Sequence, residues 1–373
     1  MTRSPRRTFL AVGTSEGGYL LTSDSTRRKW ARRGPFLRKE SVNSFAYRPD
    51  DETLFAATLS EGVFMSDDFG RTWKPASRGL NVRKVWSVAI DPREPETLYA
   101  GTHYGHLFRS EDSGGRWEEV VGLHGAPGRK EWGIDWALGT TGLCIHTILI
   151  DQNDGRKVFI VSSGGGTYRS DDRGETWNSL QNGIQRTCPV GGTSAAPDIP
   201  INEKATVLEK HLKEVHSCTH KLALSENSPG TMYQQSHCGV YGSADSGDNW
   251  EDISPGDSVR HGFPIALIEN GTQSLFVVPA FQGNCKKHNS CIKGQLAVFR
   301  RQDSKWEKLV AGLPKGVHTC VLRDGMATDG LKEPGVYFGT TTGEVFGTLD
   351  AGEHWRPMMR GAGRIQGVSS FAT

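Results

Sequence analysis

The chain has 373 residues, 36% hydrophobic and 23% charged, so it can bury a large core and is not a disordered chain. Its 44 basic and 42 acidic residues nearly balance without long runs of either sign, which excludes a broad electrostatic surface for nucleic acid or for an anionic membrane. No apolar run approaches the roughly 20 residues that a membrane-spanning helix needs, so we expect a soluble protein.

The first predicted element is a strand near the N-terminus. The stretch SPRRTFLAV begins like a twin-arginine export signal, but its apolar run ends at Val12 and the polar GTSEGG follows. The same order of apolar residues and a glycine turn recurs at 53–62, which favours a strand over a signal. Seven cysteines without an export signal favour a reducing compartment, with unpaired or metal-bound thiols. We therefore expect a cytoplasmic location.

An eight-residue motif with two acids, a glycine and a tryptophan recurs along the chain. Its five copies are SDDFGRTW (66–73), SEDSGGRW (110–117), SDDRGETW (170–177), SADSGDNW (243–250) and TLDAGEHW (348–355). Each copy follows two alternating apolar runs joined by a glycine turn, which predicts two strands leading into a further turn. In that turn the Asp can accept backbone N–H groups, the Gly can adopt positive φ, and the Trp can pack between sheets.

Two degenerate copies raise the number of repeats to seven. They are SDSTRRKW (23–30), which lacks the Gly, and FRRQDSKW (299–306), in which the Asp is displaced. The repeated tryptophans are spaced 43 to 73 residues apart, at Trp30, Trp73, Trp117, Trp177, Trp250, Trp306 and Trp355. Four short strands fit each interval, and four-stranded units at this period indicate propeller blades. The predicted fold is an all-β, seven-bladed β-propeller that forms a single domain over 1–373.

The five motifs resemble the Asp-box, or BNR, repeats of sialidase-type β-propellers, and the resemblance covers essentially the whole chain. Stretches such as GLCIHTILID (142–151) and VLRDGMATD (321–329) are similar to a prokaryotic subgroup often labelled sialidase-like or glycosyl-hydrolase-like. The resemblance implies the fold more than the function. A sialidase would also need an arginine cluster and an F/Y-R-I-P segment, and the nearest string, GFPI (262–265), lacks the arginine.

The two ends of the chain are expected to form one blade. The first unit begins directly with its second strand, TFLAVGT (8–14), while the C-terminal GVSSFAT (367–373) resembles the inner strand SVNSFAY (41–47). We therefore predict that the C-terminal strand completes the first blade and closes the ring, with 366–373 paired against 7–14.

Two insertions interrupt the repeat. The first, 185–217, joins blades four and five, and Leu208, Leu212 and Val215 at helical spacing predict a short helix in it. We expect it to lie against the face of the blade-to-blade loops, as a lid or a partner-binding element. The second, 281–294, is a long loop in blade six, in which Cys285 and Cys291 are either unpaired thiols or form a disulfide or a metal clip with His288.

Aligned inner strands place ionisable residues at one equivalent position. His146, His220 and Asp324 occupy this slot in blades four, five and seven. The other four blades place Ser369, Asn43, Trp86 and Phe263 there. Because inner strands begin at the axial opening on the face of the blade-to-blade loops, these residues are expected to lie near one another. Two histidines and a carboxylate are a ligand set of non-haem iron and catalytic zinc sites.

Other residues are expected beside this slot. The turn QQSHCG (234–239) brings Gln235 and His237 to the same face, RKEWGIDW (129–136) adds Glu131, and Arg323 precedes Asp324. A divalent ion, zinc or iron, is therefore a candidate cofactor, with the metal ligands His146, His220, His237 and Asp324. Cys144, Cys218 and Cys238 lie next to these histidines and offer a rival ligand set with sulfur.

Structural roles compete with the metal site. Sheets in a propeller are radial, so inner-strand side chains point largely at neighbouring blades. His146 and His220 would then be hydrogen-bonded core histidines, and Asp324 would pair with Arg323 or with a backbone N–H group. Cys144, Cys218 and Cys320 are individually expected as small buried residues.

Three functions fit this sequence, and it leaves open whether the protein is an enzyme. The first is to bind or act on a small ligand at a His- and Asp-lined axial pocket, with Gln235, His237 and Trp86 as ligand-binding groups and with or without a metal. The second is a glycoside hydrolase with the catalytic residues Glu131, Asp324 and Arg323 acting on a glycan. The third is a non-catalytic scaffold for a protein partner, as in Asp-box propellers of the photosystem-assembly type.

Overall fold

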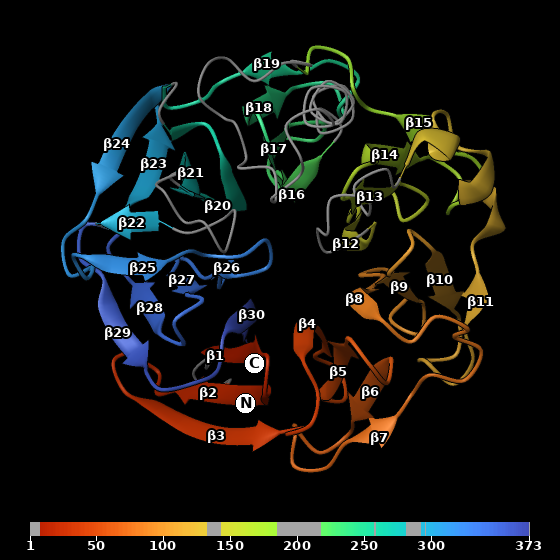
Figure 1. Cartoon of the computed structure of the whole chain (residues 1–373), viewed down its shortest axis with the longest axis horizontal. Helices are drawn as coiled ribbons and strands as arrows, with labels where there is room; N and C mark the ends of the chain where they lie inside the picture. The colour runs from red at the N-terminus through yellow and green to blue at the C-terminus, as the bar shows by residue number, and fades with distance from the viewer. Residues whose placement is uncertain are drawn as a thin grey trace, which may run out of the picture.

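The computed structural model describes residues 8–132, 143–184, 218–256, 259–280, 292–294 and 296–372. Seven four-stranded antiparallel sheets are arranged radially around a central axis (Figure 1). This arrangement confirms the predicted all-β, seven-bladed propeller. Within these described ranges no helix is long and apolar enough to cross a membrane.

Blades one to four follow one another around the ring, each listed here from the axis outwards. Blade one contains β30 (Ile365–Ala372), β1 (Thr8–Thr14), β2 (Gly17–Ser23) and β3 (Trp30–Phe36). Blade two contains β4 (Val42–Arg48), β5 (Thr53–Thr58), β6 (Val63–Ser66) and β7 (Lys74–Pro75). Blade three contains β8 (Val85–Ile90), β9 (Leu98–Thr102), β10 (Leu107–Ser110) and β11 (Glu118–Glu119). Blade four contains β12 (Ile145–Ile150), β13 (Val158–Ser162), β14 (Gly166–Ser170) and β15 (Asn178–Ser179).

Blades five to seven repeat the same order. Blade five contains β16 (Thr219–Leu224), β17 (Met232–Ser236), β18 (Gly239–Ser243) and β19 (Glu251–Asp252). Blade six contains β20 (Gly262–Asn270), β21 (Thr272–Pro279), β23 (Val298–Gln302) and β24 (Lys305–Leu309). Blade seven contains β26 (Met326–Thr328), β27 (Val336–Gly339), β28 (Val345–Thr348) and β29 (Arg356–Met359). Two 3-10 helices, η1 (Val121–Gly125) and η2 (Arg129–Glu131), follow blade three.

The ring is closed by the two ends of the chain, as predicted. Strand β30 pairs antiparallel with β1, from Thr8 opposite Ala372 to Thr14 opposite Ile365. The first and the last strand of the described chain consequently lie side by side in blade one (Figure 1). Because β30 contributes the inner strand of this blade, the first and last residues of the propeller belong to one sheet.

Each of the five Asp-box motifs folds into the same hydrogen-bonded turn. In the box at 170–177, the Ser170 hydroxyl donates to Asp172 Oδ1 over 2.7 Å and accepts the Gly174 N–H over 2.7 Å. The Thr176 N–H donates to the same Asp172 oxygen over 2.8 Å. Gly174 has φ +101°, a conformation that favours glycine. The predicted roles of the Asp and the Gly are confirmed, and the first residue of the box adds a hydroxyl that binds both.

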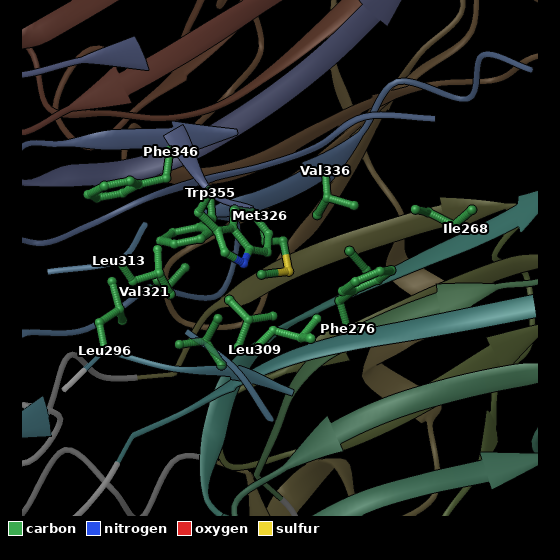
Figure 2. Close-up of a cluster of buried hydrophobic side chains, with 14 residues drawn as sticks. Ile268, Phe276, Leu296, Leu309, Leu313, Val321, Met326, Val336, Phe346 and Trp355 are labelled. Carbon is green, nitrogen blue, oxygen red and sulfur yellow. The ribbon is translucent and has the colours of Figure 1, made fainter. Parts of the chain in front are cut away.

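Hydrophobic clusters fill the spaces between neighbouring blades. In the cluster between blades six and seven, Trp355 packs beside Met326 and Leu313 (Figure 2). Trp117, Trp177, Trp250 and Trp355 are buried, with 2% to 4% of their surface exposed. Trp30, Trp73 and Trp306 are only half-buried. The predicted packing of the motif tryptophan between sheets therefore holds most fully in four of the seven repeats.

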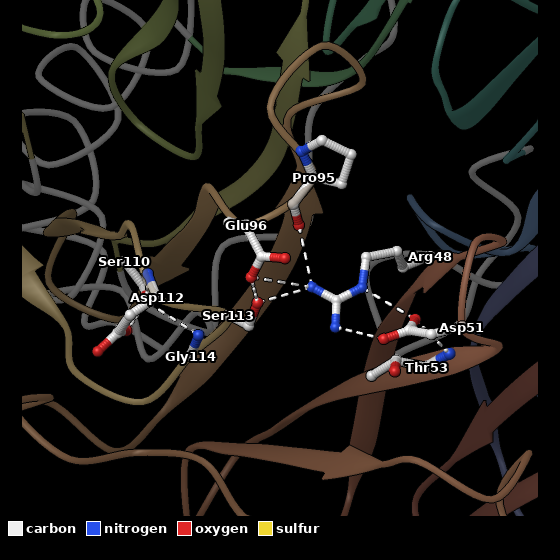
Figure 3. A network of polar contacts seen from close by, with 9 residues as sticks. All are labelled: Arg48, Asp51, Thr53, Pro95, Glu96, Ser110, Asp112, Ser113 and Gly114. Atoms are coloured by element: carbon white, nitrogen blue, oxygen red, sulfur yellow. Dashed lines mark hydrogen bonds and ion pairs between the residues drawn. The ribbon is translucent and has the colours of Figure 1, made fainter.

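A buried arginine fastens blade two to the Asp-box turn of blade three. Arg48 binds both carboxylate oxygens of Asp51, over 2.9 and 2.7 Å, at the end of its own strand (Figure 3). Its Nη1 also donates to the Pro95 carbonyl over 3.3 Å and to Ser113 Oγ over 2.6 Å. One side chain thus ties an inner strand to the neighbouring blade on the Asp-box face.

The two predicted insertions fall largely outside the described residues. The stretch 185–217, with its predicted helix, lies outside them, as does 281–291. The last part of the second insertion forms β22 (Ile292–Gly294), which pairs antiparallel with β25 (Val317–Thr319). The loop of blade six is therefore joined to the chain segment that leads into blade seven.

Candidate functional site

Six of the seven inner strands carry a register shift at the same level near the axial opening. The residues at these shifts are Gln366, Asn43, Trp86, His146, His220 and Phe263. A β-bulge re-aims its side chain and interrupts strand pairing, and bulges are over-represented beside functional sites. In blade one the shift falls at Gln366, so the alignment that put Ser369 in this slot is wrong. Ser369 instead pairs with Ala11 within the regular strand.

His146 is fully buried between blades four and five. Its Nε2 donates to the Thr219 carbonyl oxygen over 3.1 Å, and its Nδ1 lies 3.3 Å from the Thr147 hydroxyl. Burial, followed by the positive charges of Arg323 and Lys221, lowers the pKa of His146 well below its ordinary value. Both ring nitrogens face partners in the strand interface, which is the arrangement expected of a core histidine.

His220, His237 and His261 form a histidine cluster between blades five and six. Their ring centroids are 5.4 Å apart for His220 and His261, 4.5 Å for His237 and His261, and 5.8 Å for His220 and His237. The His220 Nδ1 donates to the Gly262 carbonyl over 2.5 Å, and the His261 Nδ1 donates to the His237 carbonyl over 3.2 Å. Because each Nδ1 carries the proton, the Nε2 atoms of His220 and His261 keep their lone pairs.

His261 belongs to this cluster but was not singled out by the sequence analysis. It lies two residues before Phe263, as Cys144 and Cys218 lie two residues before His146 and His220. Extending that alignment to blade six would have identified it. Burial lowers the pKa of His261 to about 4. The hydrogen bond to the His237 carbonyl raises this pKa, and the positive charge of Arg323 lowers it further. The pKa of His220 is also lowered well below its ordinary value, first by burial and then by Arg323.

Lys221 and Asp324 form an ion pair across the axial opening. Lys221 lies on β16 of blade five, and its Nζ donates to Asp324 Oδ1 just before the inner strand of blade seven. Blade six separates these two blades around the ring, so their side chains meet at the axis rather than within one blade interface. Asp324 is thus brought to the axis, as predicted, but its carboxylate is engaged by Lys221 and not by the adjacent Arg323.

Arg323 places a second positive charge at the axis. Its guanidinium lies 5.3 Å from the centroid of the Phe263 ring. Its charge acts on His146, His220 and His261, which belong to three different blades. The Nε atom of Arg323 is buried and has no hydrogen-bond partner among the described residues. In the described part of the chain, no carboxylate forms an ion pair with Arg323.

The remaining predicted site residues have varied surroundings. The Gln235 amide is buried and donates to the carbonyls of Ser236 and Arg260, each over 2.9 Å. It therefore links its own turn to the segment that leads into β20. Trp86 is half-buried, and its Nε1 is a buried atom without a partner among the described residues. Glu131 ends η2, and its side chain lies outside the described part of the structure. A catalytic role for Glu131 therefore stays a prediction.

The cysteines differ from the expectation of seven unpaired or metal-bound thiols. Cys144, Cys218 and Cys320 are buried and form no disulfide, as expected of small core residues. Burial raises the pKa of the Cys144 thiol to about 11. Cys238 is disulfide-bonded, so the expectation is wrong for this residue. The cytoplasmic location stays a prediction.

A group of side chains that could hold a metal lies away from the predicted ligands. Among the described residues, His106, Glu119 and His124 are the group of three whose ligand atoms lie within 4.8 Å of one another. Burial acts to raise the pKa of Glu119, but the hydrogen bonds from His106 and His124 lower it overall. The sequence analysis missed this group, because His106 and Glu119 are 13 residues apart without a metal-site motif.

A cavity of about 270 Å³ opens at the opposite end of the inner strands. It is lined by residues that follow β12 and β16, among them Asp151, Gln152 and Glu226, and by Thr328 at the end of β26. The Gln152 side-chain amide donates to Glu226 over 2.8 Å. This cavity is on the Asp-box face, so it is separate from the histidine cluster.

Comparison with known proteins supports the fold without assigning a family. No family model matches the chain, and no curated protein matches it. An ancestral GH74 enzyme is similar over 88% of this chain, at 17% identity and a TM-score of 0.59. The GH74 enzyme of Niastella koreensis is similar over 94%, at 16% identity and a TM-score of 0.56. This chain spans only 38% and 47% of the lengths of those two chains.

A protein chain from a nidogen/laminin complex matches over nearly its whole length. It covers 97% of this chain and 98% of its own, at 10% identity and a TM-score of 0.50. Identities this low show a shared fold and no more. The chain is therefore a seven-bladed β-propeller that resembles, in fold alone, two GH74 enzymes and a chain of a nidogen/laminin complex.

Proposed function

We propose that the protein binds a small hydroxylated anion at the axial opening, with Arg323 as the group that recognises its negative charge. The observation that supports this most strongly is the unbalanced charge of Arg323. The neighbouring Asp324 is neutralised by Lys221, and the imidazoles of His220 and His261 have lowered pKa values and are uncharged at neutral pH. A partly buried cation without a counter-ion costs free energy, which a bound carboxylate or phosphate would offset.

The groups around Arg323 suit hydroxyl groups on the ligand. The Nε2 atoms of His220 and His261 carry lone pairs that can accept a hydroxyl proton. At the equivalent bulges of blades two and three, the Asn43 amide and the Trp86 Nε1 are buried without partners among the described residues. Buried polar atoms are normally hydrogen-bonded, so their lack of partners favours a site for water or ligand. A sugar acid or a small hydroxy acid combines both requirements.

The two alternative functions make different demands on the same residues. A glycoside hydrolase needs two carboxyl groups that flank the scissile bond. The ion pair of Asp324 with Lys221 favours a fixed, structural carboxylate at this position and so favours binding over hydrolysis. A protein-binding scaffold requires no small anion at the axis, and the likeness to a chain of a nidogen/laminin complex is an analogy of fold alone.

Thermal unfolding in the presence of different anions tests the proposal. The protein is unfolded in buffer with acetate, phosphate, gluconate or glucuronate, and the same series is run with Arg323→Gln. Arg71→Gln is the matched control, because Arg71 is exposed in an Asp-box turn on the opposite face. We expect the hydroxylated acids to raise the melting temperature of the wild type and of Arg71→Gln but not of Arg323→Gln. Equal shifts in all three proteins, or no shift with any anion, would contradict the proposal.

A further inference from the structure

Three metal-ligand side chains meet on the rim of blade three, well separated in sequence from the axial residues. His106 lies in the turn between β9 and β10, Glu119 is the last residue of β11, and His124 belongs to η1. The turn between second and third strands and the connection to the next blade open on the same face of a propeller. The three residues, here named the rim triad, are therefore brought together by one blade.

The rim triad converges on a single carboxylate oxygen. The His106 Nδ1 donates to Glu119 Oε1 over 2.5 Å, and the His124 Nε2 donates to the same oxygen over 2.8 Å. The two ring centroids are 5.8 Å apart. Two nitrogen donors and one oxygen donor thus point into one small region, with every pair of ligand atoms within 4.8 Å.

The donor atoms need to move only slightly to surround an ion. Four-coordinate zinc has bonds of about 2.0–2.1 Å, which puts its donor atoms about 3.3 Å apart. The distance from the shared oxygen to each nitrogen would therefore increase by less than about 1 Å. On binding, each ring proton would pass to the other ring nitrogen, and the metal would take its place. Side-chain rotations in a turn and a 3-10 helix can supply a movement of this size.

No protein cation competes for Glu119 in the described part of the chain. The nearby Arg129 donates to the carbonyls of Tyr104 and Gly105 and stacks on Trp132, with 4.5 Å from its guanidinium carbon to the ring centroid. The ion pairs of Glu119 are those with His106 and His124. A metal would therefore displace only hydrogen bonds within the rim triad.

We propose that His106, Glu119 and His124 bind a divalent transition metal, zinc in the first place, with a fourth position open to water. Nitrogen donors favour zinc over magnesium or calcium, which prefer oxygen ligands. Solvent reaches the site, because the His124 side chain is 53% exposed and a cavity of about 290 Å³ borders Glu119. The ion would fasten η1, and with it the connection to blade four, onto the β9–β10 turn.

Zinc titration of chelator-treated, full-length protein tests this site by calorimetry. The variants His106→Ala, Glu119→Gln and His124→Ala each remove one ligand. His354→Ala is the matched control, because His354 forms an exposed pair with Asp350 over 3.1 Å but has no third ligand beside it among the residues that the structure describes. We expect each rim-triad variant to bind one equivalent fewer than the wild type, or to bind it at least about 100-fold more weakly, since even changes behind the ligands cost 10–100-fold. His354→Ala should match the wild type.

Cobalt absorption and thermal unfolding distinguish metal binding at the rim triad from binding at a cysteine and from unfolding of the variants. The rim triad has no sulfur, so cobalt bound there gives d–d bands without intense sulfur-to-metal absorption. The variants are expected to keep the melting temperature that the wild type has in chelator. The proposal would be overturned if the wild type binds no zinc, or if Glu119→Gln and His106→Ala bind as many equivalents of zinc as the wild type. It would also be overturned if the cobalt ion that these variants fail to bind gives a strong sulfur-to-cobalt band in the wild type.

Discussion

Arg48 and Arg323 show that an arginine side chain can stabilise the folded protein at one position and destabilise it at another. Arg48 is buried and binds Asp51, Pro95 and Ser113, so its charge and its donors are satisfied. Arg323 lies at the axis. In the described part of the chain its buried Nε has no hydrogen-bond partner, and no carboxylate forms an ion pair with its guanidinium. Residues that lower stability in this way are often retained for binding.

Substitution of these two arginines should therefore have opposite effects on stability. Arg323→Gln removes an unbalanced charge, and we expect it to raise the free energy of unfolding by about 1 kcal/mol in ligand-free buffer. Arg48→Gln leaves a carboxylate and a carbonyl without their donor and should lower it by about 1–3 kcal/mol. Urea unfolding of both variants measures the difference. If Arg323→Gln destabilises the protein as much as Arg48→Gln does, Arg323 is a structural residue.

The buried histidines make stability depend on pH. His146, His220 and His261 have folded-state pKa values below the ordinary value near 6.5, so the unfolded chain binds protons first as the pH falls. Their contribution to the free energy of unfolding is fully present above about pH 6.5 and is lost as the pH falls towards 4. For His261 alone this loss is about 3 kcal/mol. Urea unfolding at a series of pH values checks this slope. His261→Asn should make it shallower, and an unchanged slope would contradict the assigned cause.

At the scale of elements, the Asp-box turn and the bulged inner strand are the two repeated devices of this fold. The box closes the outer part of a blade by hydrogen bonds among four neighbouring residues, and its Trp packs against the preceding blade, as Trp177 does in the cluster between blades three and four. The bulge turns one residue of the inner strand away from regular pairing at the axial opening. The first device builds the scaffold, and the second supplies the side chains of the candidate site.

The packing of the motif tryptophans can be tested by comparing two repeats. Trp177 is buried in the cluster between blades three and four, so Trp177→Ala should cost about 3–5 kcal/mol, the range for a large buried aromatic. Trp306 is half-buried, and Trp306→Ala should cost less than about 2 kcal/mol. Chemical unfolding gives both values. A loss below about 1 kcal/mol for Trp177→Ala would mean that this Trp does not hold two blades together.

These two devices differ in how far the sequence predicts them. The box is a local structure, so the spacing of its Ser, Asp, Gly and Trp was enough to predict seven blades. The closing strand was predicted from the likeness of GVSSFAT (367–373) to the inner strand SVNSFAY (41–47). The bulge depends on the register of two paired strands, which the alignment missed by three residues when it placed Ser369 where Gln366 lies.

Contacts between distant residues were hardest to predict. Lys221 pairs with Asp324 across 103 residues, although Arg323 is adjacent in sequence. The rim triad combines a turn, a strand end and a 3-10 helix, and no single periodic pattern contains all three. The sequence therefore predicted the scaffold and the level of the axial site, but not which charges are paired there.

The propeller as a whole depends on closure of the ring by β30. This strand contributes the inner edge of blade one and pairs with β1 over its whole length. It also packs Ile365 and Val368 into the cluster shared with blade seven. Removing it would leave β1 as an unpaired edge at the axis and expose that cluster.

Truncation tests the closure directly. A chain that ends at Arg364 lacks β30, and we expect it to melt at a much lower temperature or to fail to accumulate in soluble form. A chain that ends at Ala372 keeps the strand and is the control. An undiminished melting temperature of the shorter chain would show that the ring does not depend on this closure.

The proposed function places an anion at the centre of this ring, where Arg323 and the histidine cluster face one another. The most direct measurement is a crystal structure of the protein with the hydroxylated acid that raises its melting temperature most. We predict that the carboxylate lies within about 2.7–3.2 Å of the Arg323 guanidinium nitrogens and that a hydroxyl group lies within the same distance of the Nε2 of His220 or His261. The account would be contradicted by an acid bound elsewhere, or by an Arg323 guanidinium paired with a carboxylate of the protein itself.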